Sequence, residues 1–254
     1  PHYDFDIHTQ SELVVYDVPL WPDNVTAHFT TQPIIFLLQG TTVFTFHTDE
    51  TAYVFEQFKQ EKVKEIKNAT EFIMTFLLHA AKYFNQALDK LNVERNQLDK
   101  NLNNHIVNTH LRHLAQIEKG LVYLSSSIKT NLMMLESLRH TPLTLQITKE
   151  AQEKLDDILI ETEQASRMVQ ISNEVTEKIS TTSNNILNNN LNDTMKFLTV
   201  WSLILTIPTI MTGFFGMNVK LPGAQFPLAW IAIIILNIVF MAWLYFYLKK
   251  NHFL

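Results

Sequence analysis

The spacing of apolar residues changes along the chain, and each change marks a different kind of element. Before residue 50 the apolar positions form short β-type runs at 13–18, 34–38 and 43–47. The segment Gln39-Gly40-Thr41-Thr42 separates the last two runs and carries the glycine typical of a hairpin turn. We therefore predict a small α/β domain in residues 1–50, and we expect this domain to begin upstream of Pro1.

Residues 51–141 have the pattern of a helical hairpin. Apolar side chains recur three and four positions apart, as they do on the buried face of an amphipathic helix. We predict one helix over residues 51–101 and a second over residues 106–139. The face that the first helix buries comprises Phe72, Phe76, Leu77, Ala80, Ala81, Phe84, Leu88, Leu91 and Leu98.

A long stalk helix is predicted over residues 142–196. It follows Thr141-Pro142, and residues 143–207 contain neither glycine nor proline, so one helix of about 100 Å fits this stretch. A seam of apolar and small polar residues runs along it. The seam favours helices arranged around a water-filled axis, and packing on the chain's own domain is the alternative for its first half. Its members are Ala151, Leu155, Ile158, Thr162, Ala165, Val169, Ser172, Thr176, Ile179, Ser183 and Ile186.

The C-terminal quarter of the chain has the composition of membrane-spanning helices. Between Phe197 and Leu248 the only charged residue is Lys220, and two uncharged stretches are each long enough to cross a membrane as a helix. We predict a first span at 197–218, an outer loop at 219–225, a second span at 226–248 and a tail at 249–254. Lys196, Lys249 and Lys250 flank the hairpin on one side, which places both termini in the cytoplasm of a multi-pass cell-membrane protein. The predicted fold is mainly α: an α+β cytoplasmic domain with long helices that continues into a two-helix transmembrane hairpin.

The first span carries a polar stripe that the second lacks. Small and hydroxyl-bearing residues recur there every three or four positions, so they share one helix face. Such a face either lets helices pack closely or lines water, and the residues alone leave both interpretations open. Pro208 lies inside this span and should loosen its hydrogen-bond ladder. The stripe comprises Asn188, Asn192, Met195, Thr199, Ser202, Thr206, Thr209, Gly213 and Gly216.

Composition and charge argue against several classes of protein. The formal net charge of −5 offers no basic surface for nucleic acid. The absence of cysteine excludes a disulfide framework and thiolate zinc sites. The sequence has no glycine-rich phosphate loop and no serine elbow, so we predict that the protein is not an enzyme and holds no cofactor.

Two small clusters contain metal-ligand residue types. His105, His110 and His113 lack the spacing of a zinc hydrolase, so solvated surface histidines are the simpler interpretation. Asp157 and Glu161 place two carboxylates four positions apart on the predicted stalk. Their mutual repulsion either keeps them in solvent or recruits a cation.

The tripeptide Gly216-Met217-Asn218 stands at the outer end of the first of two C-terminal spans. In this context it strongly resembles the signature of the CorA family of divalent-cation transport proteins. Residues 192–199 and 208–218 are similar to that family's first transmembrane segment almost throughout. A looser similarity extends back over the rest of the chain.

The resemblance implies a homopentamer in membrane lipid that transports Mg²⁺ and is gated by intracellular divalent ions. Each subunit would give its long helix to a central pore, with Gly216, Met217 and Asn218 as the selectivity filter. Met195 and Leu198 would form a hydrophobic constriction. The pore lining that the resemblance implies is Asn192, Met195, Leu198, Thr199, Ser202, Thr206, Thr209 and Gly213.

The resemblance also implies a regulatory metal site on the stalk. Asp157 corresponds to the family's intracellular sensing carboxylate, which binds a divalent ion between subunits and favours the closed state, and Glu161 lies near it. The acid that the neighbouring subunit would supply cannot be placed from the sequence. Three carboxylates at the start of the helical region are candidates: Asp49, Glu50 and Glu56.

Two departures from the family pattern keep other interpretations open. The outer loop reads Lys220-Leu221-Pro222-Gly223, where many magnesium-transporting members carry an acid, and a ring of lysines would repel cations. His79 and Lys82 occur near positions where relatives carry acids. The alternatives are a Zn²⁺, Co²⁺ or Ni²⁺ transporter, with or without proton coupling, and a non-conducting membrane-anchored scaffold or ion sensor.

Overall fold

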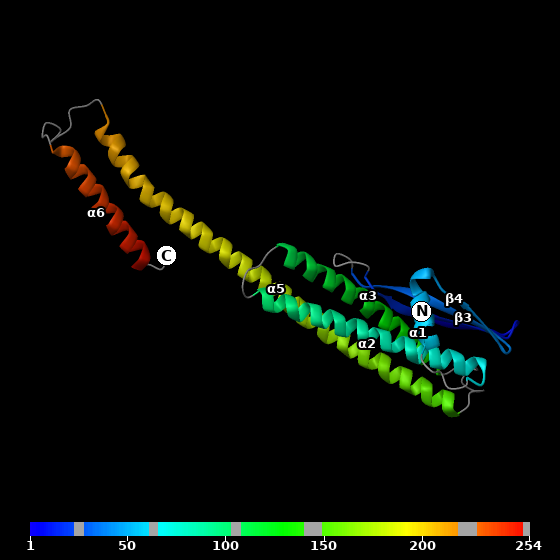
Figure 1. Ribbon diagram of the computed structural model, residues 1–254. Coiled ribbons are helices and arrows are strands. Elements are labelled where there is room, and N and C mark those ends of the chain that lie inside the picture. Colours follow the sequence, from blue (N-terminus) through cyan, green and yellow to red (C-terminus); the bar gives the residue numbers. More distant parts are fainter. Residues whose placement is uncertain (23–27, 61–65, 103–107, 140–148, 218–227, 251–254) are drawn as a thin grey trace. The chain divides into compact units, whose positions relative to one another are not determined.

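The computed structural model describes residues 1–22, 28–60, 66–102, 108–139, 149–217 and 228–250 (Figure 1). It consists of two compact units, Pro1–Ser183 and Asn184–Leu254. The first unit contains a four-stranded sheet and the helices that pack on it, and the second contains two apolar helices. The fold is therefore mainly helical with a small sheet, as the sequence predicted.

The sheet is an antiparallel meander in the order β1-β2-β3-β4. Its strands are β1 (His2–Asp6), β2 (Ser11–Leu20), β3 (Thr30–Gln39) and β4 (Thr42–Phe46). Gly40 turns the β3–β4 hairpin at φ 59°, a backbone conformation that glycine adopts without strain. The predicted hairpin is confirmed, whereas β1 is an additional strand that the apolar pattern did not reveal.

The helices of the first unit cover one face of the sheet. They are α1 (Ala52–Gln60), α2 (Ala69–Leu102), α3 (Asn108–Leu138) and the first part of α5 (Lys149–Phe215). Alternate residues over 14–18 of β2 and 34–38 of β3 are buried against them: Val14, Tyr16, Val18, Ile34, Phe36 and Leu38. The predicted apolar face of α2 lies in the same core, so this prediction is confirmed.

The prediction of one helix over residues 51–101 is wrong, because α1 ends at Gln60 and α2 begins at Ala69. The start of α2 is fixed by a cap. The Asn68 side chain accepts a hydrogen bond from the backbone N–H of Glu71 at 2.8 Å, and the Glu71 carboxylate accepts one from the N–H of Lys67 at 3.0 Å. These two bonds satisfy donors that a helix N-terminus leaves open.

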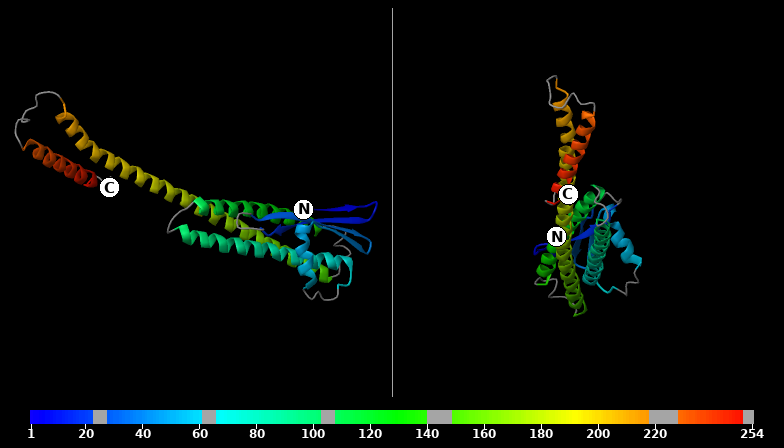
Figure 2. Two further views of the ribbon diagram at one scale, coloured as in Figure 1. Left: turned by 45° about the horizontal axis from the view of Figure 1, so that its top comes forward. Right: turned by 90° about the vertical axis from the view of Figure 1, so that its left-hand side faces the viewer.

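Helices α2 and α5 run parallel and side by side in the first unit (Figures 1 and 2). Three polar bridges with nearly constant sequence separation join them. Lys154 Nζ contacts Glu71 Oε1 at 3.1 Å and Thr75 Oγ1 at 2.8 Å, and Ser172 Oγ donates to Asn92 Oδ1 at 2.8 Å. The third bridge joins Asn85 to Glu161. Together they fix the register of α5 against the hairpin of α2 and α3.

The second unit contains the end of α5 and α6 (Ala229–Lys250). Both helices are long and apolar enough to cross a membrane. Helix α5 continues through Pro208 and ends at Phe215, beyond the proline-free stretch. Residues 140–148, where the start of the long helix was predicted, lie outside the described residues.

Candidate ion pathway and regulatory carboxylates

The predicted polar stripe lies on one face of α5 in the second unit, and all of its residues from Asn188 to Gly216 are exposed. A different face of the same helix packs on α6, where Val200 and Ile204 are buried together with Leu248. The stripe therefore takes no part in the packing of α5 on α6. Its surface is free for another helix or for water.

The hydroxyl groups of the stripe share one hydrogen-bond pattern. Each donates its proton to the backbone carbonyl four residues earlier, at 2.8 Å from Thr199, Ser202 and Thr206 and at 2.9 Å from Thr209. A hydroxyl has one proton and two lone pairs, so each of these groups presents only acceptor sites outward. The water molecules around a dication turn their protons outward, so a surface that presents only acceptor oxygens can accept hydrogen bonds from them.

The positions on the two sides of the hydroxyl groups differ in chemistry. On the N-terminal side, Met195 of the stripe and the adjacent Leu198 expose 67% and 66% of their surfaces and form an apolar patch. At the other end, the N–H of Gly216 donates to the Thr212 carbonyl at 2.9 Å, and a Cβ at Gly216 would lie 3.0 Å from that oxygen. Glycine thus relieves a tight contact where the helix ends. Met217 is exposed, and Asn218 lies outside the described residues.

The seam of the stalk does not face an open axis over most of its length. From Ala151 to Ser183 most of its members are buried inside the chain's own first unit, including the polar Thr162, Ser172 and Thr176. The interpretation as a water-facing seam is therefore wrong here, and the alternative of packing on the chain's own domain extends beyond the first half. The small hydroxyl residues are tolerated because Thr162 and Thr176 donate to carbonyls of their own helix.

The two carboxylates proposed for regulation have different surroundings. Asp157 is exposed, whereas Glu161 is half-buried and accepts a 2.8 Å hydrogen bond from Asn85 Nδ2. The neighbouring Asp156 forms a 3.1 Å ion pair with Arg139. Within the part of the chain that the structure describes, no three histidine or acidic side chains are grouped closely enough to hold a metal ion. Completing a site at Asp157 would thus require ligands from elsewhere.

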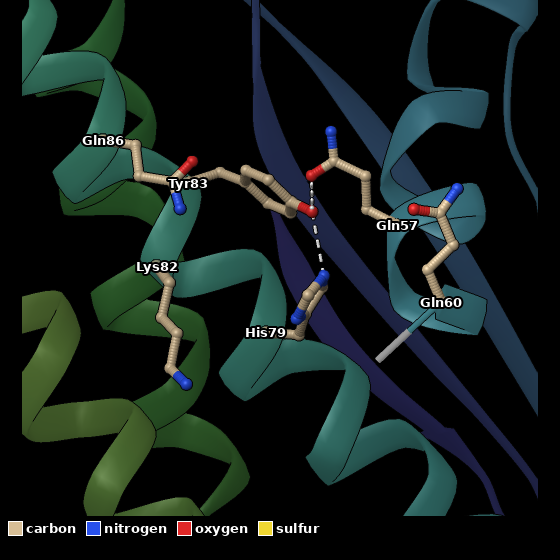
Figure 3. A pocket seen from close by; sticks show the side chains of 6 residues that line it. All are labelled: Gln57, Gln60, His79, Lys82, Tyr83 and Gln86. Atoms are coloured by element: carbon tan, nitrogen blue, oxygen red, sulfur yellow. Dashed lines mark hydrogen bonds between the residues drawn. The ribbon is translucent and has the colours of Figure 1, made fainter. Parts of the chain in front are cut away.

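A polar pocket of about 350 Å³ opens between α1 and α2 (Figure 3). Its lining includes Lys82 and the buried His79, whose Nε2 lies 2.8 Å from Tyr83 Oη. The Tyr83 hydroxyl in turn donates to Gln57 Oε1. Among the described residues no carboxylate lines this pocket, so its chemistry does not favour a divalent cation.

The histidine cluster does not form a metal site in the described residues. His113 Nε2 lies 3.5 Å from Glu94 Oε2, so this histidine contacts α2 and is not simply a solvated side chain. His105 lies outside the described residues. Sequence reasoning also missed Asn85, Arg139 and Lys154, because their partners lie far away along the chain.

A polar stripe on one of two apolar helices is typical of a membrane transport protein. The family model described as "CorA-like Mg2+ transporter protein" matches residues 1–250 of the chain. The protein belongs to this family, whose members are transporters of divalent cations. The predicted family is confirmed.

Three comparisons illustrate the relationship. The cobalt/magnesium transport protein CorA of Methanocaldococcus jannaschii is 24% identical over 248 residues, which cover 94% of this chain and 76% of that protein. The complete structure of the CorA magnesium transporter from the same organism has a TM-score of 0.81 at 21% identity, covering 100% of this chain and 80% of the other. The full-length CmaX protein has a TM-score of 0.70 at 15% identity, covering 98% and 77%. These structural similarities establish the fold.

Proposed function

We propose that the protein forms a homopentameric channel that moves hydrated divalent cations, Mg²⁺ first, across the cell membrane. The pore would be lined by the stripe of α5, and the filter would be Gly216, Met217 and Asn218. Family membership supports transport of divalent cations. The observation that carries the pore assignment is the row of hydroxyl groups whose protons all bond to the helix backbone.

The chemistry of the stripe suits a cation that keeps its water shell. Mg²⁺ gives up coordinated water reluctantly, so a wall of neutral acceptors can hold its outer waters without trapping the ion. The hydroxyl groups of Thr206 and Thr209 supply such acceptors, and Asn192 and Asn218 would add amide oxygens. Met195 and Leu198 would close the pathway by dewetting until the helices move apart.

The proposed topology places both termini in the cytoplasm. Lys196 precedes the first span, and Lys249 and Lys250 end the second, so the positive charge lies on one side of the hairpin. Lys220 is the single basic residue in the outer loop. The long helices and the sheet would then sense the internal solution, with Asp157 as one ligand of a regulatory ion.

Transport of Zn²⁺, Co²⁺ or Ni²⁺ is the second candidate. The relative from Methanocaldococcus jannaschii is named as a cobalt and magnesium transport protein, which supports including Co²⁺. With a lysine in the outer loop, we expect uptake of fewer kinds of cation, or slower uptake, than with an acidic loop. A ring of positive charge would repel incoming cations.

The test is ion flux into liposomes that contain the purified full-length protein. Mg²⁺, Zn²⁺, Co²⁺ and Ni²⁺ are compared at equal concentration, with and without a pH gradient. Saturable Mg²⁺ entry that does not respond to pH supports the proposal. Zn²⁺ entry that follows the proton gradient, with little Mg²⁺ entry, contradicts the Mg²⁺ assignment and supports the second candidate, a proton-coupled Zn²⁺ transporter. Flux of none of the four ions contradicts transport and favours a scaffold or sensor.

A further inference from the structure

The polar pocket between α1 and α2 presents hydrogen-bond donors and one positive charge. Its lining combines two buried side chains with four exposed ones, and no described carboxylate belongs to it. Because the lining offers no negative charge, it suits a ligand that brings one. The lining residues are Gln57 and Gln60 from α1, and His79, Lys82, Tyr83 and Gln86 from α2 (Figure 3).

A chain of hydrogen bonds at the bottom of the pocket orients Gln57. The Tyr83 hydroxyl donates its only proton to Gln57 Oε1, so its oxygen accepts from His79 Nε2 at 2.8 Å, and that nitrogen carries a hydrogen. His79 and Tyr83 are both buried, which keeps this chain in place. Since the oxygen of the Gln57 amide is engaged by Tyr83, the group that Gln57 offers to a ligand is its NH₂, with two donors.

Lys82 supplies the positive charge of the pocket. It is exposed, and it forms no ion pair with any carboxylate that the structure describes. Two acids of the same helices, Glu56 on α1 and Asp89 on α2, are not part of the lining. The Lys82 ammonium is thus available to an anion that enters the pocket.

The donor set fits a phosphoryl group better than a carboxylate. A phosphoryl group carries nearly two negative charges at neutral pH and has three strong acceptor oxygens. These oxygens point in different directions, so they can meet donors on two facing helices at once, and lysine is a common partner of phosphate. The volume of about 350 Å³ is within the range of small-molecule sites, so an organic group attached to the phosphate also has room.

We propose that this pocket binds a phosphoryl group, either as inorganic phosphate or as the phosphate end of a small metabolite. The Lys82 ammonium opposes its charge, and the Gln57 NH₂ donates to one of its oxygens from the other helix. Because α1 ends at Gln60 and α2 begins at Ala69, the bound group joins two separate helices. The site lies in the first unit and is independent of the proposed pore in the second.

The test is isothermal titration calorimetry of the full-length protein in detergent and metal-free buffer, with inorganic phosphate, AMP, adenosine and acetate as probes. We expect phosphate and AMP to bind and adenosine and acetate not to bind. An affinity for AMP above that for phosphate identifies a phosphorylated metabolite as the ligand, and an affinity at or below it identifies inorganic phosphate. Binding is measured without transport, so failure of the proposed function leaves this readout intact.

Three variants locate the site. Lys82→Gln should weaken phosphate binding at least about tenfold, because a charge-assisted hydrogen bond is lost. Gln57→Leu should weaken it several-fold, since the donor from α1 is lost. Lys129→Gln is the matched control, because it removes the same charge from an exposed position on α3 outside the pocket, and its affinity should equal that of the wild type.

Four results would overturn the inference. The first is the absence of binding of both phosphate and AMP at millimolar concentration, and the second is acetate binding as tight as that of phosphate. The third is an equal change of affinity in Lys82→Gln and Lys129→Gln, including no change in either. The fourth is wild-type affinity in Gln57→Leu, which would remove α1 from the site.

Discussion

Glu161 on α5 accepts a 2.8 Å hydrogen bond from the amide of Asn85 on α2. This bond joins two helices of one chain and takes up part of the coordinating capacity of the Glu161 carboxylate. Asp157 lies one turn earlier on α5 and is exposed. Of the two carboxylates, Asp157 is therefore the one left open to solvent, while Glu161 helps hold the helix that carries it.

We predict that Asp157→Asn weakens closure by internal divalent ions. An amide is a poorer ligand for Mg²⁺ than a carboxylate, so an ion that binds the closed state would bind less tightly and shift the population less. The half-maximal internal Mg²⁺ concentration for closure should rise several-fold in proteoliposomes loaded with graded Mg²⁺.

Glu161→Gln is the matched control for this prediction. The glutamine keeps an oxygen that accepts from Asn85, so the contact between the two helices survives. Its dose response should stay near that of the wild type. An unchanged response in Asp157→Asn, or an equal shift in both variants, would remove Asp157 from the role of sensor.

The proposed pore lining, in which the hydroxyl groups of the α5 stripe act as acceptors for water, predicts a loss of flux in Thr209→Val. Valine has the shape of threonine but lacks the oxygen, so one ring of water acceptors would be replaced by methyl groups. We expect the Mg²⁺ flux to fall at least about tenfold, which corresponds to about 1.4 kcal/mol at the barrier. Initial rates in liposomes with matched protein content measure it.

Thr194→Val supplies the matched comparison on the same helix. Thr194 is exposed and its hydroxyl donates to the Asn190 carbonyl at 2.8 Å, as the hydroxyl groups of the stripe do with theirs, but it lies off the stripe. Its flux should remain close to wild type. Equal losses in Thr194→Val and Thr209→Val would indicate a general effect of valine on the helix and would refute this role of the hydroxyl groups of the stripe.

The filter proposal predicts that Asn218→Ala abolishes flux while the oligomer stays intact. The amide oxygens of five Asn218 side chains would hold the outer waters of the arriving ion, and alanine has no such oxygen. Size-exclusion chromatography with light scattering checks the assembly, and liposome flux checks transport. Wild-type uptake in this variant would exclude Asn218 from the filter, and a scaffold would tolerate even Asn218→Leu.

Local patterns in the sequence predicted the elements whose signals are local. The β3–β4 hairpin follows from Gly40, the buried face of α2 from the spacing of Phe76, Leu77 and Phe84, and the two apolar helices from their length and lack of charge. The break before Ala69 was missed, since the apolar spacing of the region did not reveal the capping role of Asn68. Strand β1 was missed because it is short and lies at the edge of the sheet.

The spacing of apolar residues in the sequence did not predict the long-range contacts. The seam from Ala151 to Ser183 has the spacing of an axis-facing helix, and only the position of α2 and α3 shows that this face is buried within the chain. Asn85 and Glu161 form a hydrogen bond although they are 76 residues apart in the sequence. Asn131 and Asp17 do so at a separation of 114 residues. Sequence spacing carries no information about such pairs, because their separation is set by the packing of whole elements.

Acid should weaken the first unit partly through Glu71. The backbone N–H of Lys67 and the ammonium of Lys154 both stabilise its charged form, so the pKa of Glu71 lies below its ordinary value of 4.5. The stability from these bonds is complete above pH 4.5 and is lost as the pH falls through the lower folded-state value. Glu71→Gln should lower the stability near neutral pH by about 1 kcal/mol or less and should flatten the acid limb of the unfolding curve.

Chemical denaturation of the full-length protein in detergent, from about pH 3 to about pH 7, measures this dependence. Glu163→Gln is the control, since Glu163 forms an exposed pair with Arg167 at 3.4 Å within one helix. Its acid limb should parallel that of the wild type. An acid limb in Glu71→Gln as steep as the wild type would show that other carboxylates account for the loss.

Asn131 bonds to the backbone of β2 with its side chain. Among the described residues the pairing of β2 with β1 ends at Val15, and two residues further along β2 Asn131 Oδ1 accepts from the N–H of Asp17 at 2.9 Å while Nδ2 donates to the Asp17 carbonyl at 3.0 Å. The amide thus makes to Asp17 the two bonds that a neighbouring strand would make. Asn131 itself is fully buried, so water cannot replace it when it is removed.

Asn131→Leu should therefore destabilise the first unit by about 2–4 kcal/mol, because two buried backbone groups would lose their partners at once. Thr130→Val, at the neighbouring half-buried position, changes a hydroxyl that bonds only within α3 and should cost little. Hydrogen exchange of the Asp17 amide provides the local readout and should speed up in Asn131→Leu but not in Thr130→Val. If exchange at Asp17 is unchanged while global stability falls, the cost lies in the packing around the introduced leucine and not in the strand edge, and the role of Asn131 as a substitute strand is wrong.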